Sequence, residues 1–470
     1  MLQKRIIVDN DGGDVFGCKS GSYEDFIAAR LINLPKTGAT TLFYTTISSG
    51  FSLFTHRTKL GSVRVGQEPY LPVNRVPQML ERGTDCLEYV SRFCRENGIE
   101  LFWGMRMNDT HDGTGQYYSD LSFRQNRFKN EHPEYLLGSS EAYPRYGART
   151  AVDYAEPAVR EMAFGFVREV LDNYDTDGVH LDFFRHPVFF PTPANGEHAT
   201  EEEIALMSEL VKRIADEVHS RGKKLSVRAP DDVYYCRFLG LDTEDWLRRG
   251  FIDLFSTTGY IQLNDWEYSA RLAHRYGVPF YASLDEIRPS NAGKAAPGRN
   301  TAEVMRARIC DAYAQGADGI LFFNYIFDSD LSKPDINDRH QMIADAREPE
   351  KLSAKRRMYY MSYRGIGNIA GGAPPHRWFQ HICTLTPISP VTVNKEAALS
   401  LLTGDASGKP AIRVLLDDEA SGEMTVGDNT FALHGGENLI SVDRLENGLN
   451  RFLFRCEKPF SIYDLSVTFD

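Results

Sequence analysis

The stretch DTDGVHLDFFRHP, Asp175 to Pro187, has the alternation of a β-strand with two different faces. Apolar side chains at Val179 and Leu181 alternate with polar ones at His180 and Asp182. Successive side chains of a strand point to opposite faces, so one face of this strand is suited to packing and the other carries a histidine and a carboxylate. Such a strand is expected where both faces are enclosed and one of them lines a site.

Seven other short apolar runs accompany this one between residue 4 and about residue 345, and amphipathic helical patterns separate them. Three helical patterns end in a glycine, at Gly98, Gly222 and Gly277, where a helix C-cap is expected. Eight strands that each precede a helix predict a (β/α)8 TIM barrel. An open doubly wound sheet is disfavoured, because no GxGxxG motif follows the first strand. The expected strands are residues 5–10, 41–47, 99–107, 177–184, 224–230, 251–257, 278–285 and 319–325.

The pattern of the chain changes after about residue 350. The stretch NIAGGAPPHRW, residues 368–378, is typical of a connector, and short alternating runs separated by Gly, Asn and Asp turns follow it. Such runs predict a small β-sandwich. We therefore expect a barrel domain at 1–350, a connector at 351–390 and a β-sandwich at 391–470. This sandwich would either bind carbohydrate or brace the barrel.

Acidic residues outnumber basic ones by 65 to 53, and the formal net charge is -12 at pH 7. This balance argues against nucleic-acid and anionic-membrane partners, because either needs a basic surface. No apolar run approaches the roughly 20 residues that span a bilayer, and no secretory signal is recognisable. We expect a cytoplasmic protein, or a mature form whose leader was removed. The 7 cysteines lack CxxC spacing, so neither a zinc site nor a disulfide framework is expected. A homo-oligomer is a possible assembly state.

In a TIM barrel the active site lies at the C-terminal ends of the strands. Side-chain alternation directs Asp182 of strand four and Asp285 of strand seven into the barrel at this end. Glu286 and Asp231 follow in neighbouring loops, and Asp9 and Asp11 close strand one. The same reasoning places Arg106, Asn108, His180 and Arg228 around the first two carboxylates, with Asp109 and His111 after strand three.

Two carboxylates at a barrel mouth are what glycoside hydrolysis requires, one as acid and one as nucleophile or base. We predict Asp182 as nucleophile or base, with Asp285, Glu286 or Asp231 as its partner. Each of these carboxylates could instead have a purely structural role, because an inward Asp beside an inward Arg often forms an ion pair within a polar layer of the barrel. We expect a carbohydrate substrate and predict contacts to it from Arg106, Asn108, Asp109, His180, Arg185, His186, Arg228, Tyr260, Asn324 and Tyr325, with Trp266 as a further stacking candidate.

The acidic residues also raise the question of a metal. The run DNDGGD, Asp9 to Asp14, is rich in oxygen ligands but lacks the spacing and terminal Glu of an EF-hand loop. His111 and Asp112 are adjacent but lack an HxH partner. A structural ion is compatible with these residues, and neither a catalytic metal nor any other cofactor is expected.

Several of these motifs resemble one family. The run DYAEPAVREMAFGFVREVLDNYDTDGVHLDFFRHPVFF (153–190), with HPEYLLG (132–138), RMNDTHD (106–112) and AQGADGILFFNY (314–325), resembles the family 10-like glycosyl hydrolases of bacteria. The likeness covers about residues 1–345, and the trailing sandwich is similar to a module that such proteins carry. The resemblance implies a glycoside hydrolase barrel, glycan hydrolysis and Asp182 as the carried-over acidic residue.

Strand four is also similar to the DGxDxDxE motif of chitinase-like barrels, but Phe184 occupies the position of its acidic Glu. Substrate-assisted chemistry is therefore not expected, and the second carboxylate must come from another strand. Two other classes of function stay open. One is a barrel that binds glycans without cleaving them, and the other is a lyase or isomerase that uses His180 with Arg228 on an acidic sugar.

Overall fold

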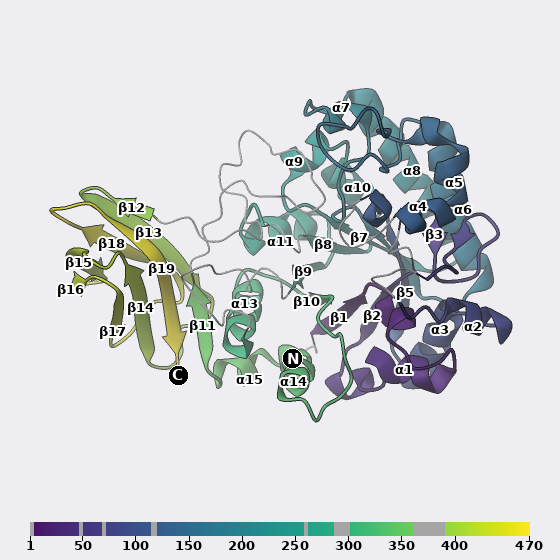
Figure 1. Ribbon diagram of the computed structural model, residues 1–470. Coiled ribbons are helices and arrows are strands. Elements are labelled where there is room, and N and C mark those ends of the chain that lie inside the picture. Colours follow the sequence, from purple (N-terminus) through teal and green to yellow (C-terminus); the bar gives the residue numbers. More distant parts are fainter. Residues whose placement is uncertain are drawn as a thin grey trace.

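Eight parallel strands close into a barrel in the computed structural model (Figure 1), which describes residues 4–46, 50–67, 72–113, 120–257, 262–285, 301–360 and 391–470. The order around the barrel is β1-β10-β9-β8-β7-β6-β5-β2, so each strand neighbours the ones expected for a TIM barrel. Every predicted strand is confirmed, with ends that differ by a few residues. The bounds are β1 (Arg5–Asn10), β2 (Thr41–Thr45), β5 (Glu100–Arg106), β6 (Gly178–Asp182), β7 (Lys224–Ala229), β8 (Leu254–Thr257), β9 (Phe280–Leu284) and β10 (Gly319–Phe323).

Helices surround the barrel (Figure 1). Local sequence fixes their ends: the Thr200 side chain and Glu203 form a capping box at the start of α8, and Gly98 ends α3 with φ 64°. The longer or barrel-covering helices are α1 (Tyr23–Arg30), α3 (Cys86–Asn97), α6 (Pro157–Asn173), α8 (Glu201–Ser220), α10 (Thr243–Arg248), α11 (Trp266–Arg275), α13 (Ala302–Ala314) and α14 (Pro334–Ala346). Short ones are α2 (Val76–Glu81), α4 (Asp120–Gln125), α5 (Arg127–Glu131), α7 (Pro191–Ala194), α9 (Val233–Phe238) and α15 (Pro349–Ser353), and β3 (Leu53–Phe54) pairs with β4 (Ser62–Val63).

The two faces of the barrel strands bury different side chains, as the alternation predicted. Val179 and Leu181 of β6 join the large core between barrel and helices. Phe43, Phe102 and Tyr281 belong to a separate apolar cluster that fills the barrel interior. Above this apolar layer the inward side chains are charged, so the barrel is closed at its centre and polar at the C-terminal ends of its strands.

Two antiparallel sheets form the C-terminal sandwich. One sheet has the order β11-β19-β14-β17 with β12 also on β19, and the other has the order β13-β18-β15-β16. Part of the stretch expected as a connector is therefore a strand of the sandwich, because β11 (Arg357–Tyr360) pairs with β19. The remaining bounds are β12 (Val391–Val393), β13 (Glu396–Thr403), β14 (Pro410–Leu416), β15 (Ser421–Val426), β16 (Asn429–His434), β17 (Glu437–Ser441), β18 (Gly448–Arg455) and β19 (Phe460–Phe469).

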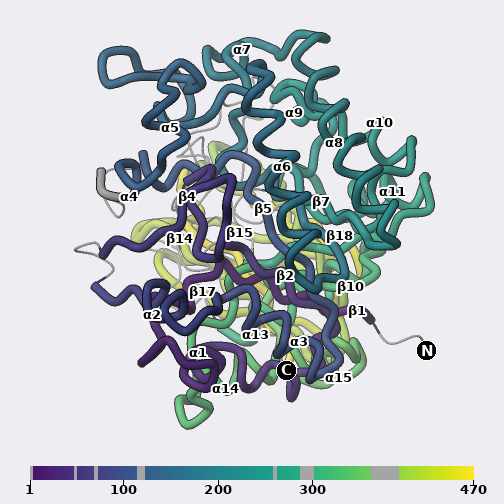
Figure 2. Tube along the Cα trace, turned by 90° about the vertical axis from the view of Figure 1, so that its right-hand side faces the viewer, coloured from purple at the N-terminus to yellow at the C-terminus, as the bar shows by residue number. Residues whose placement is uncertain are grey.

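The sandwich lies against one flank of the barrel, beside α13 (Figure 1), and falls behind the barrel after a turn of 90° that brings the barrel toward the viewer (Figure 2). Ala307 of α13 is 2% exposed and belongs to the sandwich core. The backbone N–H of Gly404 donates to Oδ1 of Asp311 on the same helix at 2.7 Å. Among the described helices, none combines the length and the apolar character that crossing a membrane requires.

Candidate active site

Asp182 ends β6 and is held by four hydrogen bonds. Its Oδ1 accepts the backbone N–H groups of Phe184 and Arg185 at 2.9 and 3.1 Å. Arg228 lies beside it on β7 and donates from Nη2 to Oδ2 at 2.5 Å and from Nε to Oδ1 at 3.2 Å. Burial raises the pKa of Asp182, but the charge and hydrogen bonds of Arg228 outweigh it, and the net pKa is lowered from 3.8. Asp182 is therefore an anion over the whole ordinary pH range.

Asp9, at the end of β1, shares the same guanidinium. Its Oδ2 lies 3.0 Å from Nη1 of Arg228, although β1 does not neighbour β6 or β7 in the barrel. Because one guanidinium bridges both groups, the carboxylates of Asp9 and Asp182 lie within about 8 Å of each other. Burial and the charge of Asp182 raise the pKa of Asp9 to about 6, against the opposing effect of Arg228. The pair thus combines one carboxyl that keeps its proton up to about pH 6 with one that is already ionised there.

The other predicted carboxylates have different surroundings. Asp231 accepts the backbone N–H groups of Leu263 and Asn264 with both oxygens, at 2.8 to 3.0 Å, so it anchors the segment that precedes α11. Asp285 is 1% exposed, and its Oδ2 lies 3.9 Å from Nη2 of Arg308 on α13. Glu286 and Tyr260 lie outside the described residues. Asp231, Asp285 and Glu286 therefore all stay predictions as partners of Asp182, although the Asp231 oxygens already accept backbone N–H groups.

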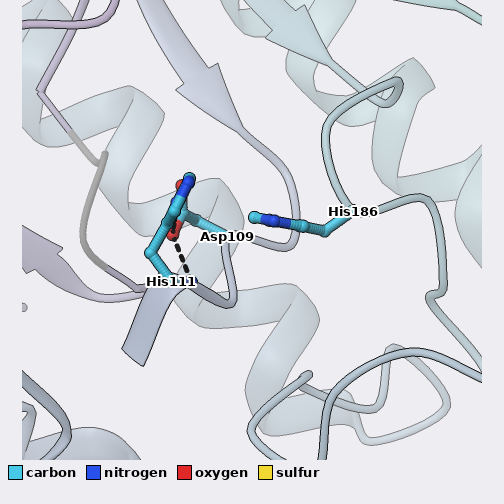
Figure 3. A group of neighbouring side chains, drawn as sticks. All are labelled: Asp109, His111 and His186. Atoms are coloured by element: carbon cyan, nitrogen blue, oxygen red, sulfur yellow. Dashed lines mark hydrogen bonds and ion pairs between the residues drawn. The ribbon is translucent and has the colours of Figure 1, made fainter. Parts of the chain in front are cut away.

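A second group of polar side chains follows β5 and β6 (Figure 3). Nη1 of Arg106 lies 3.2 Å from Oδ2 of Asp109, and Nδ1 of His111 lies 2.9 Å from both Asp109 oxygens. Nη2 of Arg185 lies 2.8 Å from Nε2 of His111. A guanidinium can only donate, so Nε2 accepts and Nδ1–H donates to Asp109. Burial raises the pKa of Asp109, but His111 and Arg106 hold it well below its ordinary value. The four residues form a relay that fixes the Arg185 side chain.

His186 points toward this relay (Figure 3) from a backbone with φ 56°, which is rare for a residue other than Gly. Its Nδ1 accepts the backbone N–H of Thr110 at 3.1 Å, so the neutral ring carries its proton on Nε2. Burial, with His111 and Arg185 nearby, lowers the pKa of His186 well below 6.5. The ring is therefore neutral and offers an N–H donor.

Asp109, His111 and His186 have the composition of a metal site, and one ligand atom from each lies within 4.8 Å of the others. Each imidazole, however, already uses its lone pair to accept an N–H, from Arg185 in one case and from Thr110 in the other. An ion would bind only after both hydrogen bonds break. The hydrogen bonding therefore favours the relay, and the absence of a catalytic metal stays an expectation.

Other predicted contact residues have structural neighbours. Asn108 is fully buried and makes hydrogen bonds with the backbone of Val152 and Val188, so it ties together the loops after β5 and β6. His180 lies one inward position below Asp182, stacks on Phe43 at 4.2 Å and has its pKa lowered to about 3 by burial. This position below the mouth gives no support to a lyase that uses His180.

Beside β1, Asn324 has φ 46° and makes two hydrogen bonds with Asp11, at 3.2 Å each. Tyr325 is 5% exposed and lies under the Arg339 guanidinium, and Trp266 is buried in the helical core beside Phe280. Neither ring therefore presents an open face for stacking a sugar. Asn324 remains a candidate contact at the mouth.

Strand alternation predicted that Arg228 lies beside Asp182, but it did not select Asp9 as the partner carboxylate. The signal was present, because Asp9 ends the first strand at the same edge of the barrel. Asp9 also belongs to the acidic run DNDGGD, which was interpreted as a possible metal site instead. The relay was missed as well, because His111 contacts Arg185 only after the two loops fold together.

No family model and no curated protein matches the chain. Among solved structures, the alpha-L-fucosidase isoenzyme 2 from Paenibacillus thiaminolyticus is 13% identical with a TM-score of 0.46, covering 77% of this chain and 51% of that one. The GH36 alpha-galactosidase AgaB from Geobacillus stearothermophilus is 13% identical with a TM-score of 0.42, covering 96% and 55%. The beta-N-acetylhexosaminidase from Bacteroides fragilis is 14% identical with a TM-score of 0.44, covering 74% and 65%. This chain thus spans about half to two thirds of their lengths, and a likeness of this extent says nothing about the reaction.

Proposed function

We propose that this protein is a glycoside hydrolase that cleaves its substrate with Asp9 as general acid and Asp182 as nucleophile or general base. The observation that carries the proposal is the pair itself: two carboxylates at the C-terminal end of a TIM barrel share Arg228 and have opposite pKa shifts. Pairs of titratable groups whose pKa values are pushed apart are the usual basis of acid and base roles.

In this reaction Asp9 donates its proton to the oxygen of the leaving sugar. Asp182, kept anionic by Arg228 and by two backbone N–H groups, attacks the anomeric carbon or activates a water. Carboxyl separations of about 5–5.5 Å accompany retention and about 6.5–9.5 Å inversion. The span of a single guanidinium admits either outcome, so the stereochemistry is an experimental question.

The first experiment is a screen of the purified protein against chromogenic glycosides of different sugars and anomers. With an oligosaccharide of the preferred sugar, whose leaving group needs protonation, Asp182→Asn and Asp9→Asn are each expected to lower kcat by about 10²- to 10⁴-fold, because each removes one half of the acid and nucleophile pair. Asp216→Asn serves as a control, since Asp216 is an exposed residue of α8 paired with Lys212. Full activity in both site variants would refute the assignment.

A second candidate function has a specific observation in its favour. Arg228 neutralises Asp182, and Asp9 and Asp182 are both 2% exposed, as in an ion-pair layer that only fills the barrel. A barrel of that kind would bind glycans without cleaving them. Saturable binding of an oligosaccharide that remains intact after prolonged incubation would favour this function over hydrolysis.

A further inference from the structure

Two side chains that follow β6, those of Arg185 and His186, carry hydrogen-bond donors that have no part in the proposed hydrolysis. Arg185 follows Asp182 by three residues, and its backbone N–H donates to Oδ1 of Asp182. Its guanidinium is fixed by His111, which is fixed in turn by Asp109. The relay therefore holds the Arg185 guanidinium in a fixed orientation, while the backbone of the same residue is tied to the Asp182 carboxylate.

His186 supplies the second donor. It is 6% exposed, and the Thr110 N–H commits its Nδ1, so its Nε2 carries the hydrogen. In the part of the chain that the structure describes, this Nε2–H has no hydrogen-bond partner. The residue that carries this donor is held by a strained backbone at φ 56°. Strain that keeps an unused donor in a barrel mouth indicates a ligand acceptor.

The charges around these donors indicate which acceptor it is. Three guanidinium groups, those of Arg106, Arg185 and Arg228, share this end of the barrel with the carboxylates of Asp109, Asp182 and Asp9. The first two carboxylates are anionic, while the pKa of Asp9 is about 6. When Asp9 holds the proton that it needs as a general acid, these described groups have one more positive charge than negative charges. One ligand carboxylate would balance them.

We propose that Arg185 and His186 form a subsite for the carboxylate of an acidic sugar, with Asp109 and His111 as positioning residues for Arg185. The subsite names a substrate class, a uronic-acid glycoside, and in that respect it rests on the proposed function. A planar carboxylate accepts from the guanidinium and from His186 Nε2–H, whereas the hydroxymethyl group of a neutral sugar offers one uncharged oxygen.

Direct binding tests the subsite without relying on turnover. Methyl β-D-glucuronide and methyl α-D-galacturonide are compared with methyl β-D-glucoside and methyl α-D-galactoside by titration of the full-length chain, monitored by ligand-observed NMR. Each pair differs only in a carboxylate against a hydroxymethyl group. At a pH about one unit below the pKa of Asp9, at least one uronide should bind about tenfold or more tightly than its neutral counterpart, as expected for charge-assisted hydrogen bonds.

Variants assign the preference to its residues. Arg185→Gln should reduce uronide affinity to the level of the neutral sugar, and His186→Asn should reduce it in part, because Asn tolerates the positive φ but does not place a donor at the same point. Arg248→Gln is the matched control, since it removes an exposed arginine of α10. The melting temperature of each variant confirms that it folds.

Two results would overturn the subsite: equal affinity for uronide and neutral sugar in the unmodified chain, including no binding of either, or a uronide preference that survives Arg185→Gln. The outcomes also separate this inference from the proposed function. Hydrolysis of neutral glycosides without any uronide preference would leave the hydrolase standing and remove the subsite. Uronide binding that depends on Arg185, without hydrolysis of any glycoside, would support the subsite and refute the hydrolase.

Discussion

At the scale of single residues, the mouth of this barrel shows how one guanidinium can give two carboxylates different protonation states. Arg228 makes two hydrogen bonds with Asp182 but only one ion-pair contact with Asp9. Both aspartates are buried to the same degree, so burial raises both pKa values. The stronger pairing reverses this effect for Asp182 alone. An acid and a base can therefore coexist in one polar layer.

The split pKa values predict how hydrolysis depends on pH. The free enzyme is active with Asp182 ionised and Asp9 protonated, so kcat/KM should be high at acidic pH and should fall as pH rises through about 6. Asp9→Asn should nearly abolish activity on substrates with poor leaving groups. It should spare activity on a dinitrophenyl glycoside, which needs no acid, and the decline near pH 6 should disappear. A decline that persists in Asp9→Asn would assign the proton to another group.

At this scale the sequence predicted which way a side chain points better than it predicted which group that side chain contacts. Alternation along β6 and β7 gave the inward positions of Asp182 and Arg228 correctly, because the period of a strand is fixed. It could not show that Asp9 reaches Arg228 across the barrel, since that contact depends on the curvature of the closed sheet. It also could not show that Asp231 turns to the backbone of Leu263, because that bond depends on a loop conformation.

At the scale of elements, the loop after β5 carries Asp109 and His111 of the relay, and a buried ion pair holds this loop in place. Nζ of Lys129 on α5 lies 2.9 and 3.1 Å from the two oxygens of Asp112, and both side chains are 0% exposed. Nζ also donates to the backbone oxygen of Asp109 at 3.3 Å. The buried charges therefore select the loop conformation in which Asp109 meets His111.

Removing one partner of this pair should be strongly destabilising. Lys129→Met leaves the Asp112 carboxylate buried without its cation and should lower the free energy of unfolding by about 3–5 kcal/mol. The double variant Lys129→Met with Asp112→Asn should recover part of the loss, because no charge remains buried. Lys212→Met, which breaks an exposed pair on α8, should cost less than about 1 kcal/mol. Urea unfolding measures all three, and equal losses for Lys129→Met and Lys212→Met would refute the anchoring role.

The turn after β1 depends on Gly12. It adopts φ 73°, and a Cβ there would overlap the carbonyl oxygen of Thr45. Gly83 has φ 77° but open space around it, so it isolates the conformational effect from the steric one. Gly83→Ala should cost about 1–2 kcal/mol. Gly12→Ala should cost at least about 3 kcal/mol, because the chain beside Asp9 must also move. If urea unfolding shows the same loss of stability for Gly12→Ala and Gly83→Ala, the turn accommodates the added Cβ without a steric cost.

At the scale of the whole molecule, the order of the two domains could be predicted from local patterns, but the way in which they join could not. The eight strands of the barrel and the short strands of the sandwich follow from local patterns. The strand β11 was assigned to a connector, because Arg357–Tyr360 is short and its partner β19 lies about a hundred residues later. Pairing across such a distance leaves no local signal.

The docking of the sandwich on α13 should make the two domains unfold together. Ala307 is 2% exposed within the sandwich core, so Ala307→Arg forces a charged side chain into the contact between the domains. We expect one calorimetric transition for the unmodified chain and two for Ala307→Arg, with the earlier one lowered in temperature. Ala314→Arg, at an exposed position of the same helix, should keep the single transition. A single transition in Ala307→Arg would show that the domains stay coupled without this contact, and two transitions in the unmodified chain would show that they are independent.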